Sequence, residues 1–111
     1  MNLSEITTLV KGTIVVDRTD CAVNFAYASD LLSDVMGHCG DESALITIQN
    51  HLNTIAVCTL VGIEVIVLCH NRPAPDDMVA AAKREGVAIV VTPLSQFETS
   101  LALSALKPSA K

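Results

Sequence analysis

The most constraining feature of this sequence is an alternation of apolar runs and helix-like segments through its second half. Three apolar runs are separated by two segments of helical character, and Gly62 and Gly86 follow those segments as helix stops. Strands joined by helical crossovers lie parallel, with right-handed connections. We therefore expect a parallel sheet, with strands at 44–48, 63–68 and 87–91 and helices over 50–61 and from Pro75 to Gly86.

A further helix is predicted near the carboxyl terminus. Ser95 and Glu98 form a capping box, and Phe97, Leu101 and Ala105 then recur at four-residue intervals on one helix face. The tail that follows, residues 107–111, is expected to be frayed.

The first part of the chain has weaker signals. Asn2 or Ser4 can cap a short helix that stops at Gly12, and a strand is expected at 13–16. A polar break separates it from a second strand at 22–28, which we expect to return close to the first.

A short helix should follow that second strand. Ser29 is a natural N-cap, Asp30 complements the positive end of the helix dipole, and the apolar stripe ends at Gly37. Together these elements predict an α/β domain of two or three layers with a mainly parallel sheet, βαβαβα after an N-terminal helix and two short strands.

Size and composition agree with one domain over residues 1–111. Half of the residues are hydrophobic and only 3% are aromatic. The core must therefore be built from Val, Ile, Leu and Ala, which suits a buried sheet covered by helices.

Several classes of partner are disfavoured by charge and hydropathy. The most apolar stretch, 55–69, is interrupted by Gly62 and Glu64 and is shorter than the ~20 apolar residues of a membrane-spanning helix. A net charge of −5 without a basic cluster argues against nucleic acid. The amino terminus lacks the features of a secretory signal. We expect a cytoplasmic protein with no membrane or nucleic-acid partner.

Polar side chains follow each of the three expected parallel strands. Ligands of open parallel sheets bind beyond the carboxyl ends of the strands, where helix N-termini also present free amides. Amides, hydroxyls, imidazoles and a guanidinium suit a small anionic or amide-bearing ligand. The residues concerned are Gln49, Asn50, His51 and Asn53 after the first strand, Cys69, His70, Asn71 and Arg72 after the second, and Thr92 and Ser95 after the third.

Structural roles account for many of these residues taken singly. Asn50 can cap a helix, Arg72 can be a solvated loop charge, and Ser95 belongs to a capping box. It is their convergence on one edge of the sheet that indicates a site.

The alternative is a redox- or metal-responsive protein. His38 adjoins Cys39 and Cys69 adjoins His70, and thiolate with imidazole is a zinc-like ligand pair. Against it, the four cysteines form no CxxC, adjacent strand residues face opposite sides, and reduced buried thiols are the expected state. We predict no metal or cofactor.

Recognised catalytic motifs are missing. The five glycines form neither GxGxxG nor GxxxxGK[ST], and there is no GxSxG. We therefore expect no catalytic residues and a protein that is not an enzyme.

Extended stretches of the chain resemble the DRTGG-domain family. They are SDLLSDVM at 29–36, ITIQNHLNTIAV at 46–57, the strand at 65–68, the Pro75 helix and TPLSQFET at 92–99. The resemblance therefore covers nearly the whole sequence, and the length is that of a stand-alone member of the family. It implies a fold similar to that of the amino-terminal domain of HPr kinase/phosphatase. Such domains are accessory parts of phosphotransacetylases and of CBS-domain pyrophosphatases, and short stand-alone forms are encoded near iron-only hydrogenase genes.

The sequence departs from this family at its defining motif. Asp17, Arg18 and Thr19 are followed by Asp20 and Cys21 in place of the glycine pair. A role that depends on close backbone approach at those glycines is therefore in doubt.

The resemblance implies a non-catalytic regulatory or ligand-sensing module, associated with energy or hydrogen metabolism and with a possible partner enzyme. A small apolar domain also gains stability by pairing, so we expect a homodimer. A small anionic or nucleotide-like ligand is expected at Ser29, Asp30, Gln49, Asn50, His51, Asn53, His70 and Arg72.

Overall fold

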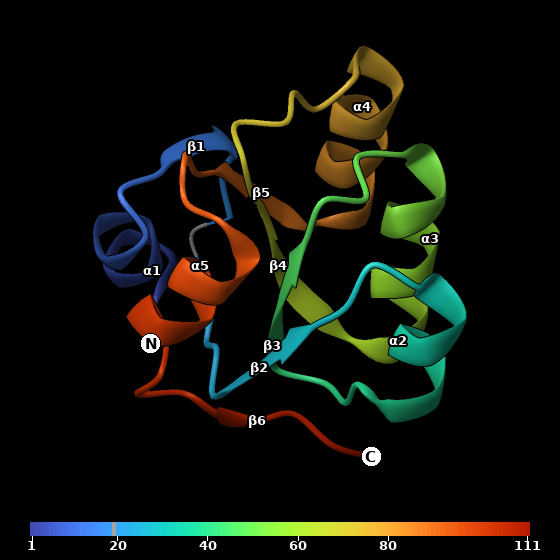
Figure 1. Ribbon diagram of the computed structural model, residues 1–111. Helices are drawn as coiled ribbons and strands as arrows, with labels where there is room; N and C mark the ends of the chain where they lie inside the picture. Colours follow the sequence, from blue (N-terminus) through green and yellow to red (C-terminus); the bar gives the residue numbers. More distant parts are fainter. Residues whose placement is uncertain (19) are drawn as a thin grey trace.

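A mixed sheet forms the middle layer of the computed structural model, which describes residues 1–18 and 20–111 (Figure 1). Its strands are β1 (Thr13–Val16), β2 (Phe25–Ala28), β3 (Ser43–Thr47), β4 (Ile63–Leu68), β5 (Ala88–Val91) and β6 (Lys107–Pro108), in the order β1-β5-β4-β3-β2-β6. The helices are α1 (Leu3–Leu9), α2 (Leu32–His38), α3 (Leu52–Val61), α4 (Asp76–Glu85) and α5 (Gln96–Ala102).

The predicted parallel sheet is confirmed. β2, β3, β4 and β5 pair in parallel, and β1 adds an antiparallel edge strand beside β5. The three strands expected in the second half of the chain lie within a residue of their predicted bounds. The chain is therefore an α/β domain with a mainly parallel sheet.

Helices cover both faces of the sheet, which gives three layers (Figure 1). On β4, Ile66 and Leu68 face a core shared with α2, α3 and α4, whereas Val65 and Val67 face a second core shared with α1 and the end of α5. All four side chains are fully buried. Burial on both faces explains why this strand is a continuous apolar run rather than an alternating one.

The helix stops are confirmed at two glycines. Gly62 follows α3 with φ 82°, and Gly86 follows α4 with φ 73°. Both lie in the left-handed region that a residue without Cβ adopts without steric cost. The capping box at Ser95 and Glu98 is also confirmed, and Asn2, rather than Ser4, caps α1.

The expectation that the second strand returns close to the first is wrong. β1 and β2 are separated by β5, β4 and β3. Between them, Cys21 and Val23 are buried beneath the sheet in the core shared with α1, and the Val23 amide donates to the Met1 carbonyl. Burial of these apolar side chains draws the segment under the sheet, so β2 begins only at Phe25.

Ser29 does not cap α2, contrary to prediction. The helix begins at Leu32, with Leu31 at the N-cap and no side-chain cap, and it continues past Gly37 to His38. The Ser29 hydroxyl instead accepts a hydrogen bond from the Leu31 amide at 3.2 Å, which makes a turn ahead of the helix.

The apolar residues spaced four apart near α5 do not face the core. Phe97 and Leu101 are 73% and 58% exposed, and Ala105 lies beyond the helix. The buried residues of this segment are Thr99 and Leu103. The short helix is thus oriented with its larger apolar side chains toward solvent.

The expected frayed tail is also wrong. Lys107 and Pro108 form β6, which pairs in parallel with β2 at the edge of the sheet. Next to it, Ser109 is buried, and its hydroxyl lies 2.9 Å from the Gly40 amide and 2.6 Å from the Ser43 hydroxyl. Hydrogen bonds to the turn before β3 therefore hold the tail in place.

Candidate functional site

The polar residues at the carboxyl ends of the parallel strands are organised around Asp30. Its carboxylate oxygen Oδ1 accepts hydrogen bonds from the Thr47 hydroxyl at 3.0 Å, from the Ile48 amide at 2.9 Å and from Gln96 Nε2 at 3.0 Å. Asp30 therefore connects the ends of β2 and β3 to the start of α5. Its predicted role as a partner of the α2 dipole is replaced by these bonds.

Gln49 extends the same cluster. Its side-chain amide donates to the Asp30 carbonyl at 2.7 Å, and its backbone amide donates to the Thr47 hydroxyl at 3.1 Å. The functional groups of Asp30 and Gln49 are thus largely used to hold the loop after β3 in shape.

A second contact spans the ends of β3 and β4. Arg72 Nη2 donates to Asn50 Oδ1 at 3.1 Å, and Asn50 Nδ2 donates to the Pro73 carbonyl at 2.7 Å. Arg72 is exposed and Asn50 is partly exposed. A guanidinium has five N–H donors, so this geometry orients Arg72 while leaving donor capacity for an anionic ligand.

The loop that carries Arg72 has an unusual backbone. His70 and Asn71 have φ values of 57° and 52°, in the left-handed region. Their amides donate to Leu94 and Thr92 carbonyls at 2.9 and 2.8 Å, which ties the loop to the end of β5. Consecutive non-glycine residues in this region cost about 1–3 kcal/mol each, and such outliers cluster at functional sites.

The remaining predicted residues border these clusters rather than join them. His51 is the exposed N-cap residue of α3 and makes no side-chain cap bond. Asn53 lies in the first turn of α3, at the rim of a groove toward α4. The Ser29 hydroxyl bonds to Leu31, and its backbone amide donates to the Ile46 carbonyl at 3.2 Å. The structure therefore brings together Asp30 with Gln49 and Asn50 with Arg72.

Gln96 and Thr47 were missed by sequence reasoning. Gln96 sits beside the predicted capping residue Ser95, and Thr47 ends a strand whose carboxyl end was already a candidate edge. A polar residue in the first turn of a helix that follows an edge loop is the signal that would have identified Gln96.

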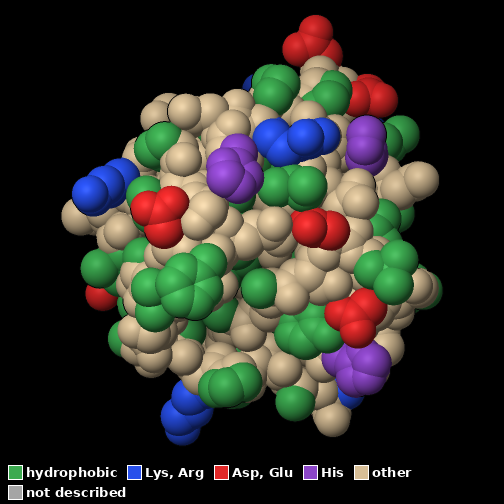
Figure 2. Space-filling view, viewed as in Figure 1, with side chains coloured by type: hydrophobic (Ala, Val, Ile, Leu, Met, Phe, Trp, Pro, Cys, Tyr) green, Lys and Arg blue, Asp and Glu red, His purple; other side chains and the backbone are tan. Residues whose placement is uncertain are grey.

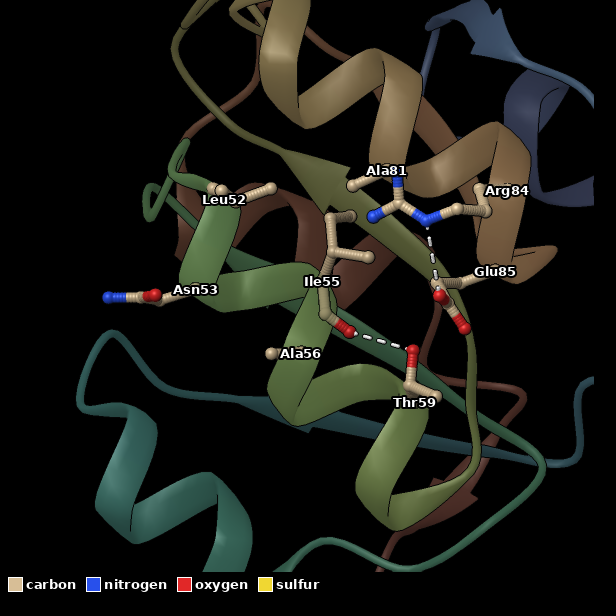
Figure 3. A pocket seen from close by; sticks show the side chains of 8 residues that line it. All are labelled: Leu52, Asn53, Ile55, Ala56, Thr59, Ala81, Arg84 and Glu85. Carbon is tan, nitrogen blue, oxygen red and sulfur yellow. Dashed lines mark hydrogen bonds and ion pairs between the residues drawn. The ribbon is translucent and has the colours of Figure 1, made fainter.

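A groove of about 450 Å³ lies between α3 and α4 (Figure 3). Its sides are formed by apolar and small polar residues of α3 and by the last turns of α4, where Arg84 Nε lies 3.4 Å from Glu85 Oε1. Figure 3 shows the Arg84 side chain extending over this groove. The lining residues are Leu52, Asn53, Ile55, Ala56, Thr59, Ala81, Arg84 and Glu85.

Three titratable side chains, Tyr27, Asp34 and His38, are in contact at α2. The Tyr27 hydroxyl donates to Asp34 Oδ2 at 2.7 Å, and His38 Nδ1 lies 3.1 Å from the other Asp34 oxygen. The hydrogen bond to the carboxylate raises the pKa of Tyr27 to about 12, and it lowers the pKa of Asp34. Figure 2 shows histidine, basic and acidic side chains interspersed with hydrophobic ones on the face viewed in Figure 1.

The Cys–His pairs considered as metal ligands are divided between interior and surface. Cys39 and Cys69 are fully buried, whereas His38 and His70 are exposed. Burial raises the pKa of the Cys69 thiol, and its sulfur lies 3.5 Å from the Thr99 hydroxyl. Within residues 1–18 and 20–111, no group of three His, Cys, Asp or Glu side chains is arranged to hold a metal ion.

All four cysteines are free and buried, as expected for reduced thiols. Among the described helices, none has the length and apolar character needed to cross a membrane.

No protein-family model and no curated protein matches this sequence. A solved structure does: the CBS and DRTGG domains of the regulatory region of Clostridium perfringens pyrophosphatase, complexed with its activator diadenosine tetraphosphate. The TM-score is 0.72 at 11% sequence identity, over 96% of this chain and 47% of the other. The chain thus spans about half the length of that structure. The resemblance inferred from the sequence is supported at the level of architecture, and the chain has a DRTGG-like α/β fold.

Proposed function

We propose that this domain is a non-catalytic regulatory module that senses a small anionic, nucleotide-like ligand at the carboxyl edge of its sheet. The observation that carries the proposal is the exposed Arg72 guanidinium, which Asn50 orients across the ends of β3 and β4. A positioned guanidinium at this edge suits phosphate or carboxylate groups.

The neighbouring residues have distinct parts in this proposal. Arg72, with His70 beside it, contacts the anionic group, and Asn50 and His51 border it at the start of α3. Asp30 and Gln49 hold the loop after β3 through their hydrogen bonds, and Ser29 and Asn53 lie at the margins. The left-handed backbone at His70 supports a loop shaped for recognition rather than for connection alone.

The structural neighbour supports the choice of ligand class. That protein belongs to a regulatory region and is complexed with a dinucleotide activator. A fold shared with such a region favours regulation over catalysis, and nucleotides carry the phosphates that an arginine recognises.

Assembly and setting complete the proposal. A domain of 111 residues with half of its residues hydrophobic gains from self-association, so we propose a homodimer. Free buried thiols favour a reducing, cytoplasmic setting. The resemblance to accessory domains supports a partner enzyme in energy or hydrogen metabolism.

The test is a thermal-shift screen with adenine nucleotides, diadenosine tetraphosphate and acetyl phosphate. A ligand present at about 100 times its dissociation constant stabilises the folded state by about 2.7 kcal/mol. We expect the shift in wild type to disappear in Arg72→Ala and to remain in Lys107→Ala, an exposed cation of β6 that pairs with the first residue of β2, at the opposite end of the sheet. Absence of a shift with every compound, or a full shift in Arg72→Ala, would refute this site.

A further inference from the structure

The outward face of α3 is uncharged and symmetric about Ala56. The helix, LNTIAVCTLV, has no acidic or basic residue. Its exposed positions all lie within about 60° of Ala56 on a helix of ~100° per residue. They are Leu52, Asn53, Ala56, Thr59 and Leu60.

Exposed leucines on this face are not explained by the monomer. Leu60 is 72% exposed and Leu52 is 46% exposed, while the intervening residues Ile55 and Cys58 are buried against the sheet. The face of a helix that is turned to solvent usually carries charged residues, whereas this face has none and only Asn53 and Thr59 are polar. The outer side of α3 therefore has the composition of an interface.

Symmetry about Ala56 makes this face complementary to itself. A two-fold axis that passes between the Ala56 side chains of two copies and reverses the helix direction places the Leu52–Asn53 end of one α3 against the Thr59–Leu60 end of the other. The two small Ala56 side chains then meet at the axis, where they permit close approach of the helices. Ala56 is exposed and is one of the residues that line the groove (Figure 3).

The neighbouring helix α4 repeats this symmetry with charges. It packs beside α3 on the same face of the sheet, and both helices connect parallel strands, so they run in the same direction. About Ala80, Asp76 mirrors Arg84 and Asp77 mirrors Lys83, and all five residues are exposed. The same axis thus brings the acidic first turn of one α4 against the basic last turn of the other.

We infer that the outer surfaces of α3 and α4 form an isologous dimer interface with a second copy of this chain. The inference rests on the homodimer part of the proposed function and assigns its surface. Each copy has a net charge of −5, which disfavours most pairings of its surfaces. This face is suited to pairing because α3, at its centre, is uncharged. Beside it, α4 is acidic in its first turn and basic in its last turn, so an antiparallel pair brings opposite charges together.

The available area agrees with a dimer of ordinary size. A standard interface buries about 800 Å² per partner, which is about a seventh of the 5455 Å² accessible surface of this chain. Ten residues of α3 extend only ~15 Å, so α3 alone is too small. With α4 beside it, one side of a molecule measuring 30 × 29 × 25 Å supplies the remainder.

The first test compares Leu60→Glu with the matched control Leu101→Glu by sedimentation velocity at micromolar concentrations. Leu101 is also exposed but lies on α5, on the opposite face of the sheet. We expect a dimeric wild type, at least a tenfold weaker dimer for Leu60→Glu and an unchanged dimer for Leu101→Glu. Circular dichroism verifies that both variants are folded.

The second test uses proximity and charge. Ala56→Cys should crosslink to its own copy on mild oxidation, because the four native cysteines are buried, and Leu101→Cys should not. Arg84→Glu and Asp76→Arg should each weaken the dimer, whereas a mixture of the two variants should form heterodimers, since both charged contacts are then attractive.

The outcomes separate this surface from the wider proposal. If wild type is a monomer, both the homodimer and this interface are wrong, and ligand sensing is judged by the thermal-shift screen alone. If wild type is a dimer that persists in Leu60→Glu and fails to crosslink through Ala56→Cys, the homodimer stands and this interface is wrong.

Discussion

Replacing Asp30 tests whether the polar cluster at the strand ends has the structural role assigned to it. Asp30→Ala removes the acceptor for three hydrogen bonds, from Thr47, Ile48 and Gln96. A hydrogen bond to a charged group contributes about 1.5–3 kcal/mol. These groups are partly exposed, so water replaces part of what is lost, and we expect a decrease of about 2–3 kcal/mol in the free energy of unfolding.

Asp30→Asn provides the matched control. It retains an oxygen acceptor but no charge, so the three bonds become neutral ones and the expected loss is about 1 kcal/mol. Gln49 bonds to the Asp30 backbone carbonyl and therefore keeps its contact in both variants.

The assay is urea denaturation followed by far-ultraviolet circular dichroism, with thermal denaturation as a second measure. For a domain of this size, about 4 °C of melting temperature corresponds to 1 kcal/mol, so Asp30→Ala should melt about 8–12 °C below wild type. A change of less than about 0.5 kcal/mol in Asp30→Ala, or equal losses in the two variants, would refute the view of Asp30 as a charged acceptor that joins β2, β3 and α5.

Three other predictions follow from local geometry. Gly62→Ala should destabilise more than Gly86→Ala in urea denaturation: both have positive φ, costing about 1–2 kcal/mol, but only at Gly62 would the new methyl lie 2.7 Å from a neighbouring side-chain carbon. Equal losses would contradict this. Tyr27, the only tyrosine, should ionise near pH 12 in an absorbance titration and at lower pH in Asp34→Asn. Its raised pKa stabilises the fold fully below pH ~10, and this contribution is lost as pH rises through about 12; an unchanged midpoint in Asp34→Asn would refute the coupling. Ser109→Ala should cost about 1–2 kcal/mol and increase the exchange of the amides at positions 107 and 109, which donate to Asn24 and Ala26, and unaltered exchange there would contradict the role of Ser109 as an anchor.

Local sequence signals determined most of the second half of the fold. The αL glycines Gly62 and Gly86 and the capping box at Ser95 act within a few residues, so their effects are visible in the sequence alone. Continuous apolar runs likewise indicate strands buried on both faces. These features were sufficient to predict the parallel α/β class and the edge of the sheet at which Gln49, Asn50 and Arg72 gather.

Only the tertiary structure decided how the weaker segments are placed. Val23 and Ser109 are buried by partners far away in the sequence, so neither the path beneath the sheet nor the β6 edge strand could be inferred from neighbouring residues. Asp30 is a further example. Its position before α2 predicted an interaction with the helix dipole, but its carboxylate instead accepts hydrogen bonds from Thr47 of β3 and Gln96 of α5. Local propensity is set by adjacent residues, whereas the choice among several possible partners is made only when the layers pack.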